Sequence, residues 1–386
     1  MKLLLATEAN EGMGHIAPWA AFVDLAMQEG IQVHMAAPNT AQLDRFLGRY
    51  LGMNVWQAPI LRFVVQQGQA SPKSWPELLV SLGYGDSDCL TGAVKAWVNI
   101  LKSLAPDVVL ADYAPALMIA AKACGIRLLE IGSGFCVPPL LKEVCSFPGA
   151  RANSPAVTAN VTNQLVSSFG TALQAVGCST AMNSFGELAL WPEKRIVTSP
   201  PELDHYGARD DVLHIGFLSS HNQGVSIKLA QQENTTVVVG YLKAATPGLE
   251  ALIADLREAS VSAFLVIPDC NEKMANTQEG VTITRELVDL PSALKQADIY
   301  LSNGGLHGVG QALRANCWPV VVPMQAEQVA MARRIVKNSW GSLWMAALPN
   351  AARQSWHAKV KSENHSRIFQ KENFKAEKTL LDMVLT

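Results

Sequence analysis

The segment from Leu301 to Arg334 constrains the fold more than any other part of the sequence. It reads LSNGGLHGVGQALRANCWPVVVPMQAEQVAMARR and begins where a short apolar run, Ile299–Leu301, gives way to glycines. A helical stretch around Gln311–Leu313 follows, then a second apolar run, Val320–Val322, and another helical opening at Glu327. Strand, glycine-rich turn, helix, strand, turn and helix in this order predict a βαβ unit of a parallel sheet.

Ligands of parallel sheets bind at the carboxyl ends of the strands, where this segment places its glycines and its polar pair. Glycines before a helix let a phosphate approach the backbone, and the helix N-terminus supplies N–H groups and partial positive charge. The pair Glu327–Gln328 combines a carboxylate with an amide, which together can hold several sugar hydroxyls. A tight turn without a ligand remains the alternative for the glycines.

Composition sets the broad class. A chain of 386 residues predicts two domains. With 49% hydrophobic residues it can fill sizeable cores. A net charge of −2 does not favour nucleic acid or an acidic membrane surface as a partner, since both require a basic face. No apolar run has the length of a spanning helix, so we expect no integral membrane segment. The composition leaves the oligomeric state open.

The cysteines indicate the compartment. The seven cysteines are dispersed and form no CxxC pair or metal-ligand spacing. The start, Met1–Ala6, is too short for a signal sequence and turns polar at Thr7. Reduced thiols and a cytoplasmic location are therefore expected.

Several polar residues follow strands of the first half. An apolar run, Leu3–Ala6, leads into a glycine-containing loop that carries His15, and the run from Pro106 to Ala111 ends in Asp112. A third run, Arg127–Ile131, ends two residues before Ser133. Since parallel strands bring their carboxyl ends to one edge, we expect His15, Asp112 and Ser133 on the same rim.

The whole chain is predicted to form two α/β domains that face each other across a cleft. The polar stretch Ser219–Ser226 is predicted as the linker. The first domain then covers residues 1–218 and the second residues 227–386, and the second includes a long C-terminal helix, His365–Leu385.

Three stretches carry a resemblance to a known family. Gly14–Pro18, GHIAP, is similar to the family motif GHxxP; Pro106–Pro115 reads PDVVLADYAP; and Asn303–Arg334 is similar to HGGxGTxxEALxxGxP followed by (D/E)QxxNAxR. In this order they resemble the GT-B glycosyltransferases, in particular the enzymes that glycosylate small molecules from nucleotide sugars. The resemblance covers most of the chain and implies two facing Rossmann-like domains. It implies a UDP- or dTDP-sugar as the donor substrate, with no metal and no further cofactor.

The resemblance also implies donor-binding residues. These are Asn303, Gly304, Gly305, His307, Gly308, Val309, Gln311, Glu327 and Gln328, with the donor base near Val288. Four of them depart from the family pattern. Asn303 stands where the family has histidine, His307 where it has glycine, Gly308 where it has Thr or Ser, and Gln311 where it has Glu. In the family that histidine and hydroxyl contact the diphosphate of the donor.

The resemblance implies that His15 is the general base that activates the acceptor hydroxyl, and that Asp112 orients it. Imidazole suits this task because its ordinary pKa is about 6.5. Two structural roles stay open beside the catalytic ones. His15 can serve as a polar cap at the start of a helix, and Asp112 can cap the helix that follows its strand.

Aromatic side chains of the first domain are candidates for an acceptor site. Phe63, Trp75, Trp97 and Phe135 favour a lipid, polyketide or aromatic acceptor, although packing that anchors loops also explains them. The predicted function is an inverting glycosyltransferase acting on a hydroxyl of a hydrophobic small molecule. The alternatives are a sugar-nucleotide epimerase or cell-wall lipid glycosyltransferase on the same fold, and a degenerate homologue that acts as a partner of an active transferase.

Overall fold

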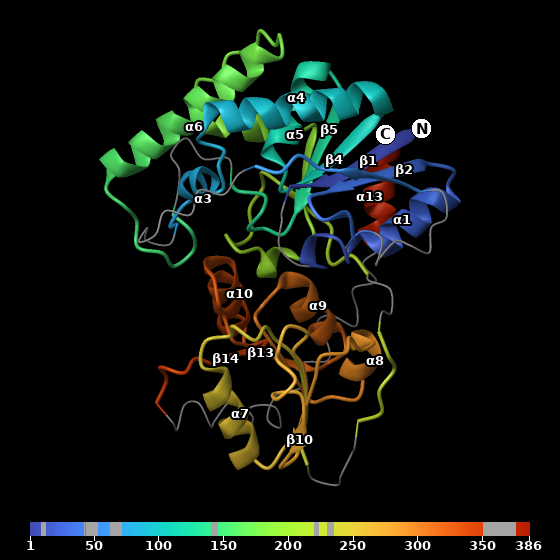
Figure 1. The fold of residues 1–386 in the computed structure, drawn as a ribbon, viewed down its shortest axis with the longest axis vertical. Coiled ribbons are helices and arrows are strands. Elements are labelled where there is room, and N and C mark those ends of the chain that lie inside the picture. The colour runs from blue at the N-terminus through green and yellow to red at the C-terminus, as the bar shows by residue number, and fades with distance from the viewer. Residues whose placement is uncertain are drawn as a thin grey trace. The chain divides into compact units, whose positions relative to one another are not determined.

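The fold is described from a computed structural model, which covers residues 1–8, 13–41, 43, 53–61, 72–139, 146–219, 224–229, 235–349 and 376–386. The chain forms two compact units (Figure 1). Unit 1 comprises Met1–Ser220 and Lys375–Thr386, and unit 2 comprises His221–Phe374. Each unit is built on one sheet.

The sheet of unit 1 is parallel throughout and has the order β3-β2-β1-β4-β5-β6-β7. Its strands are β1 (Lys2–Thr7), β2 (Gln32–Ala37), β3 (Asn54–Gln57), β4 (Val108–Asp112), β5 (Arg127–Gly132), β6 (Lys194–Val197) and β7 (Leu213–His214). Its helices are η1 (Met13–His15), α1 (Trp19–Gln28), α3 (Trp75–Ser81), α4 (Ser87–Leu104), α5 (Pro115–Cys124), α6 (Pro155–Ala175), η2 (Phe185–Leu190), η3 (Pro201–Leu203) and α13 (Ala376–Leu385).

Helix α13 corrects the predicted domain assignment, because it belongs to unit 1 and not to the second domain. It lies beside α1 (Figure 1), and its apolar side joins a core that contains Leu3, Leu5 and Phe22. The Arg127 guanidinium donates to the carbonyl oxygens of Met383 and Val384 at 2.9 and 2.7 Å. The reason is physical: helices α1 and α13 together bury the apolar strand residues on this side of the sheet.

The sheet of unit 2 has the order β10-β11-β9-β8-β12-β13-β14, and only the β10–β11 pair is antiparallel. Its strands are β8 (Val237–Tyr241), β9 (Ser262–Val266), β10 (Thr277–Gln278), β11 (Val281–Thr284), β12 (Ile299–Ser302), β13 (Trp318–Val321) and β14 (Ser342–Leu343). Its helices are α7 (Leu249–Glu258), α8 (Leu290–Leu294), α9 (Leu306–Arg314) and α10 (Ala326–Lys337).

The predicted α/β class and parallel sheets are confirmed in both units. The strand order of unit 2 reverses between β8 and β12, because β9 and β11 lie on one side of β8 and β13 and β14 lie beyond β12. Such a reversal is the place where open parallel sheets bind ligands.

Candidate functional site

His15 and Asp112 form a pair at the carboxyl edge of the unit 1 sheet. Asp112 ends β4, and His15 ends the short η1 helix. The imidazole Nδ1 lies 3.2 and 3.1 Å from the two carboxylate oxygens. An ionised carboxylate only accepts hydrogen bonds, so beside an ionised Asp112 the Nδ1 atom donates and the proton of the neutral imidazole lies on Nδ1. The His15 side chain is 23% exposed and that of Asp112 only 7% exposed, so the imidazole is accessible and its carboxylate partner is buried.

The contacts bear on the capping role considered for Asp112. The N-cap residue of α1 is Pro18, whose side chain makes no capping hydrogen bond. The first turn of α5 is also uncapped by its own N-cap, Ala114. Its N–H groups at Ala116 and Leu117 donate to the carboxylate of Glu8 at 3.1 and 2.8 Å. Glu8 therefore takes the capping role considered for Asp112, which leaves Asp112 to hold His15.

Glu8 is a site residue that the sequence reasoning missed. It also accepts hydrogen bonds from the Tyr84 hydroxyl and the Trp97 indole, both at 2.6 Å. Burial raises the pKa of Glu8 to about 7, although all four donors oppose the shift. Its position directly after the first predicted strand is the signal that could have found it. The carboxylate thus ties α4, through Trp97, to the start of α5.

An aromatic row extends from His15. Tyr113 has φ = 50°, a left-handed conformation that costs a residue with a side chain roughly 1 kcal/mol or more. This turn places its ring between those of His15 and Trp75, with centroid distances of 6.0 and 5.2 Å. The rings of Phe135 and Phe147 continue the row at 5.9 and 4.7 Å. The structure thus joins the predicted residues Trp75 and Phe135, and adds Tyr113 and Phe147.

Hydrogen bonds hold this row in place. The Trp75 indole donates to the Phe135 carbonyl at 2.8 Å, and the Phe135 N–H donates to Nδ1 of His205 at 3.1 Å. The buried Asp204 carboxylate accepts from Arg209 at 2.9 Å and bonds His214 at 3.0 Å. Burial raises the pKa of Asp204, but His214 and Arg209 outweigh it and the net shift is downward.

Trp75 and Phe135 are each 5% exposed, so both are largely buried. Trp97, another predicted acceptor residue, is fully buried and donates to Glu8 instead of joining the row. Phe63 lies outside the described residues.

In unit 2 the glycine-rich turn connects β12 to α9 and contacts the start of α10. Gly304 has φ = 95°, and a Cβ there would lie 2.6 Å from a methyl of Val321 and 3.5 Å from the Cβ of Gln328. Only glycine fits this position. The structure therefore brings Gly304 and Gln328 together, as the spacing of the motif implies. The N-cap of α9 is Gly305, which has no side chain to cap the helix, and among the described residues no side chain bonds the N–H groups of its first turn.

The side-chain amide of Asn303 forms hydrogen bonds within unit 2. Its Nδ2 donates to Thr246 Oγ1 at 3.0 Å and to the Val322 carbonyl at 2.9 Å. Its Oδ1 accepts from the N–H of Lys243 at 3.1 Å. Asn303 thus joins the ends of β8, β12 and β13, and it fixes the turn rather than offering its amide to a ligand.

His307 lies in the first turn of α9 as a neutral imidazole. Desolvation, with a smaller contribution from the positive charge of Arg314, lowers its pKa to about 4. Its Nε2 lies 2.6 Å from Nε2 of Gln311, one turn later. With the amide nitrogen as donor, the imidazole Nε2 accepts and Nδ1 carries the proton.

Tyr300 explains the glycine at position 308. A Cβ on Gly308 would lie 2.6 Å from the phenol oxygen of Tyr300, which is 2% exposed. Burial strongly raises the pKa of Tyr300. The side chain of Tyr300, from β12, therefore fills the space that a Thr or Ser side chain at position 308 would need.

The remaining predicted donor residues also lie at this edge. Glu327 and Gln328 are in the first turn of α10, where Gln328 Oε1 accepts from the N–H of Met324 at 2.7 Å. Val309 is buried in α9. Val288 lies in an isolated parallel bridge with Val225, which ties residues 224–229 to this part of unit 2.

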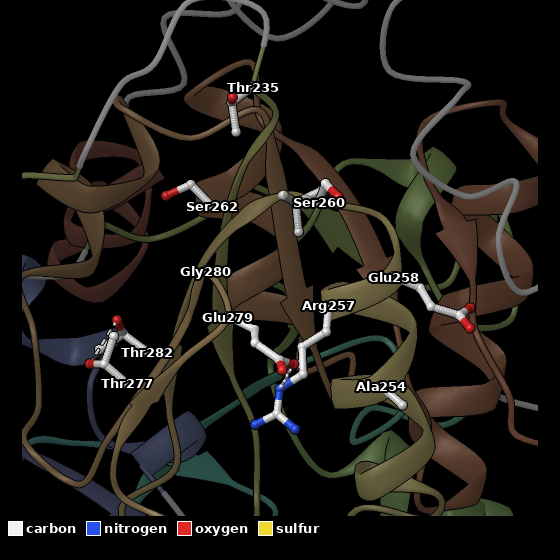
Figure 2. Close-up of a pocket in the computed structure, with 11 residues that line it drawn as sticks. Thr235, Ala254, Arg257, Glu258, Ser260, Ser262, Thr277, Glu279, Gly280 and Thr282 are labelled. Carbon is white, nitrogen blue, oxygen red and sulfur yellow. Dashed lines mark hydrogen bonds and ion pairs between the residues drawn. The ribbon is translucent and has the colours of Figure 1, made fainter.

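A separate hollow in unit 2 lies at the opposite edge of the sheet. Figure 2 shows its lining at the starts of β9 and β11 and the end of α7. Arg257 and Glu279 form an ion pair there at 3.7 Å. Since ligands of parallel sheets bind at the carboxyl edge, this hollow is not part of the candidate site.

Comparisons with known proteins settle the fold. No protein-family model and no curated protein matches the chain. Among solved structures, the glycosyltransferase SsfS6 of Streptomyces sp. SF2575 in complex with thymidine diphosphate is 16% identical, with a TM-score of 0.66 over 100% of this chain and 99% of its own. The calicheamicin glycosyltransferase CalG4 is 15% identical, with a TM-score of 0.69 over 100% and 97%. The chain has the GT-B fold.

A third structure adds a different ligand. The spinosyn rhamnosyltransferase SpnG in complex with spinosyn aglycone is 14% identical, with a TM-score of 0.66 over 99% of this chain and 96% of its own. At such identities the likeness shows the fold alone. Within the described residues, no helix has the length and apolar character to cross a membrane.

Proposed function

We propose that this GT-B protein is an inverting glycosyltransferase that moves a sugar from a nucleoside-diphosphate sugar to a hydroxyl of a hydrophobic small molecule. The observation that carries the proposal is the His15–Asp112 pair at the carboxyl edge of unit 1, beside the aromatic row. An alcohol is a poor nucleophile at neutral pH, so a positioned base assists its attack on the anomeric carbon.

In the proposed mechanism Nε2 of His15 takes the proton of the acceptor hydroxyl. The buried Asp112 carboxylate holds the tautomer and stabilises the imidazolium that forms, as in other carboxylate–imidazole units. The acceptor oxygen bonds to the anomeric carbon while the bond to the diphosphate breaks. Because the displacement is direct and uses one base, the anomeric configuration inverts. Tyr113, the half-buried ring beside His15, is assigned to the apolar part of the acceptor, and the buried rings of Trp75 and Phe135 support it.

Unit 2 is proposed to bind the donor. The uncapped first turn of α9 offers N–H groups to the diphosphate, and Glu327 and Gln328 are assigned to the sugar hydroxyls. The backbone near Val288 is assigned to the base. Two of the similar structures contain thymidine diphosphate, which makes dTDP the first nucleotide to test.

The test is calorimetric binding of dTDP, UDP and GDP, followed by turnover of the matching nucleotide sugar with aromatic acceptors. One nucleotide is expected to bind, and turnover is expected only with an acceptor present. Consumption of nucleotide sugar without an acceptor would replace the proposal with an epimerase. Absence of binding for all three would overturn it in favour of a non-catalytic partner protein, which the engaged Asn303 amide would then explain.

A further inference from the structure

We infer that Lys243 supplies the positive charge for the donor diphosphate, an inference that rests on the proposed function. Lys243 is exposed and stands two residues after β8. Strands β8 and β12 flank the reversal of strand order in unit 2, so Lys243 and Asn303 follow the two strands that border the expected ligand crevice.

The turn itself provides neutral groups. The Asn303 amide is engaged by three internal hydrogen bonds, and Gly308 has no side chain because Tyr300 fills its space. His307 stays uncharged at neutral pH. A diphosphate carries at least two negative charges, and the partial charge at a helix N-terminus is only about half an elementary charge. A side chain with a full positive charge beside the turn is therefore needed to balance the charge of the diphosphate.

The backbone of Lys243 is held rigidly at this place. Its N–H donates to Asn303 Oδ1 at 3.1 Å, and its carbonyl accepts from the N–H and the hydroxyl of Thr246 at 3.0 and 2.6 Å. Asn303 also binds the Thr246 hydroxyl, which closes the ring of bonds. Among the described residues no ion pair engages the Lys243 ammonium group.

Other cations at this edge are placed less well. Lys273 follows β9 and Arg285 follows β11, which are one and two strands beyond β8 and lie away from β12. Arg285 also forms an ion pair with Glu272 at 4.0 Å. The first carboxylate after β9 is that of Asp269, and it accepts a hydrogen bond from the N–H of Ala244 at 2.9 Å. These positions single out Lys243.

The experiment compares dTDP with thymidine by calorimetry on the full chain, using UDP and uridine if the unaltered chain prefers them. Lys243→Met is expected to weaken diphosphate binding roughly 10- to 100-fold, because a charge-assisted hydrogen bond is lost. Affinity for the nucleoside is expected to stay unchanged. Lys243→Arg should retain diphosphate binding, and Lys273→Met, an exposed lysine at the same edge, serves as the matched control.

Equal diphosphate affinity of Lys243→Met and the unaltered chain would overturn the inference while the proposed function stands. An equal loss in Lys273→Met would also overturn it, because the effect would then be general charge. If the unaltered chain binds no nucleoside diphosphate, the proposed function fails and the inference fails with it. Melting temperatures check that the variants fold. They are expected to stay unchanged in Lys243→Met, because the Lys243 side chain is exposed.

Discussion

In unit 1 the helix that follows β4 has first-turn N–H groups bonded to a carboxylate, whereas among the described residues of unit 2 no side chain bonds the first-turn N–H groups of the helix that follows the glycine turn. Glu8 accepts from the first turn of α5, while the N-cap of α9 is Gly305, which has no side chain to cap the helix. The proposal therefore assigns the anion of the donor to the helix terminus of unit 2. The residues beside α5 are instead His15 and Asp112, the pair proposed above as the general base and its partner. Two edges of the same topology are thus prepared for different chemistry by what occupies one helix terminus.

The largest expected effect tests the acid–base side of this contrast. His15→Asn should lower turnover roughly 10³-fold, within the usual range for loss of a general base, and leave nucleotide binding unchanged. Single-turnover kinetics with saturating donor measure the step. Asp112→Asn should also lower turnover strongly, because the tautomer is no longer fixed. Equal rates for His15→Asn and the unaltered chain would exclude His15 as the base.

The two edges should respond oppositely to pH. The pKa of Glu8 is raised to about 7 in the folded chain, so its contribution to stability is full below about 4.5 and is lost as the pH rises through 7. The pKa of His307 is lowered to about 4, so its contribution is present above about 6.5 and is lost as the pH falls toward 4. Each amounts to about 3 kcal/mol.

Hydrogen exchange at pH 5 and pH 7.5, corrected for the intrinsic rates, measures this difference. Amides of α5 should be less protected at the higher pH, and amides of α9 more protected. Glu8→Gln should remove the trend in α5 and leave that in α9. Parallel trends in both helices would contradict the assignment.

A smaller effect tests whether the glycine turn of unit 2 excludes a side chain at position 308. Gly308→Ala should destabilise unit 2 by about 1–3 kcal/mol, because the new Cβ meets the phenol oxygen of Tyr300. Tyr300→Phe should recover part of the loss, which a double-mutant cycle of denaturant unfolding measures. Additive effects of the two changes would show that Tyr300 is not the obstacle. Gly305→Ala, with open space around its Cβ, is the control.

The smallest effect concerns the aromatic row. Trp75→Phe removes the hydrogen bond to the Phe135 carbonyl and part of the apolar surface. The Michaelis constant for the acceptor should rise roughly 10-fold, about 1.4 kcal/mol, while that for the donor stays constant. Trp191→Phe, in unit 1 outside the row, is the comparison. A change in the donor constant alone would move Trp75 out of the acceptor site.

The parallel sheets and the edge that carries His15 and Asp112 could be predicted from the sequence, because apolar runs and the polar residues after them show a strand and its end. The pairing of Glu8 with α5 could not be predicted, because its hydrogen-bond donors, Ala116 and Leu117, lie 108 and 109 positions further along the chain. The engagement of Asn303 and the filling of Gly308 by Tyr300 depend on neighbouring strands in the same way. The place of α13 was predicted wrongly, because an amphipathic helix does not indicate which apolar surface it covers.

The return of α13 to unit 1 also sets an order of events during synthesis. Residues 376–385 leave the ribosome after all of unit 2, yet they complete the core around Leu3 and Phe22. One apolar surface of unit 1 therefore stays uncovered while unit 2 is being translated. Truncation before Ala376 would remove α13 and leave the apolar surface of unit 1 that this helix covers open to chaperones and proteases.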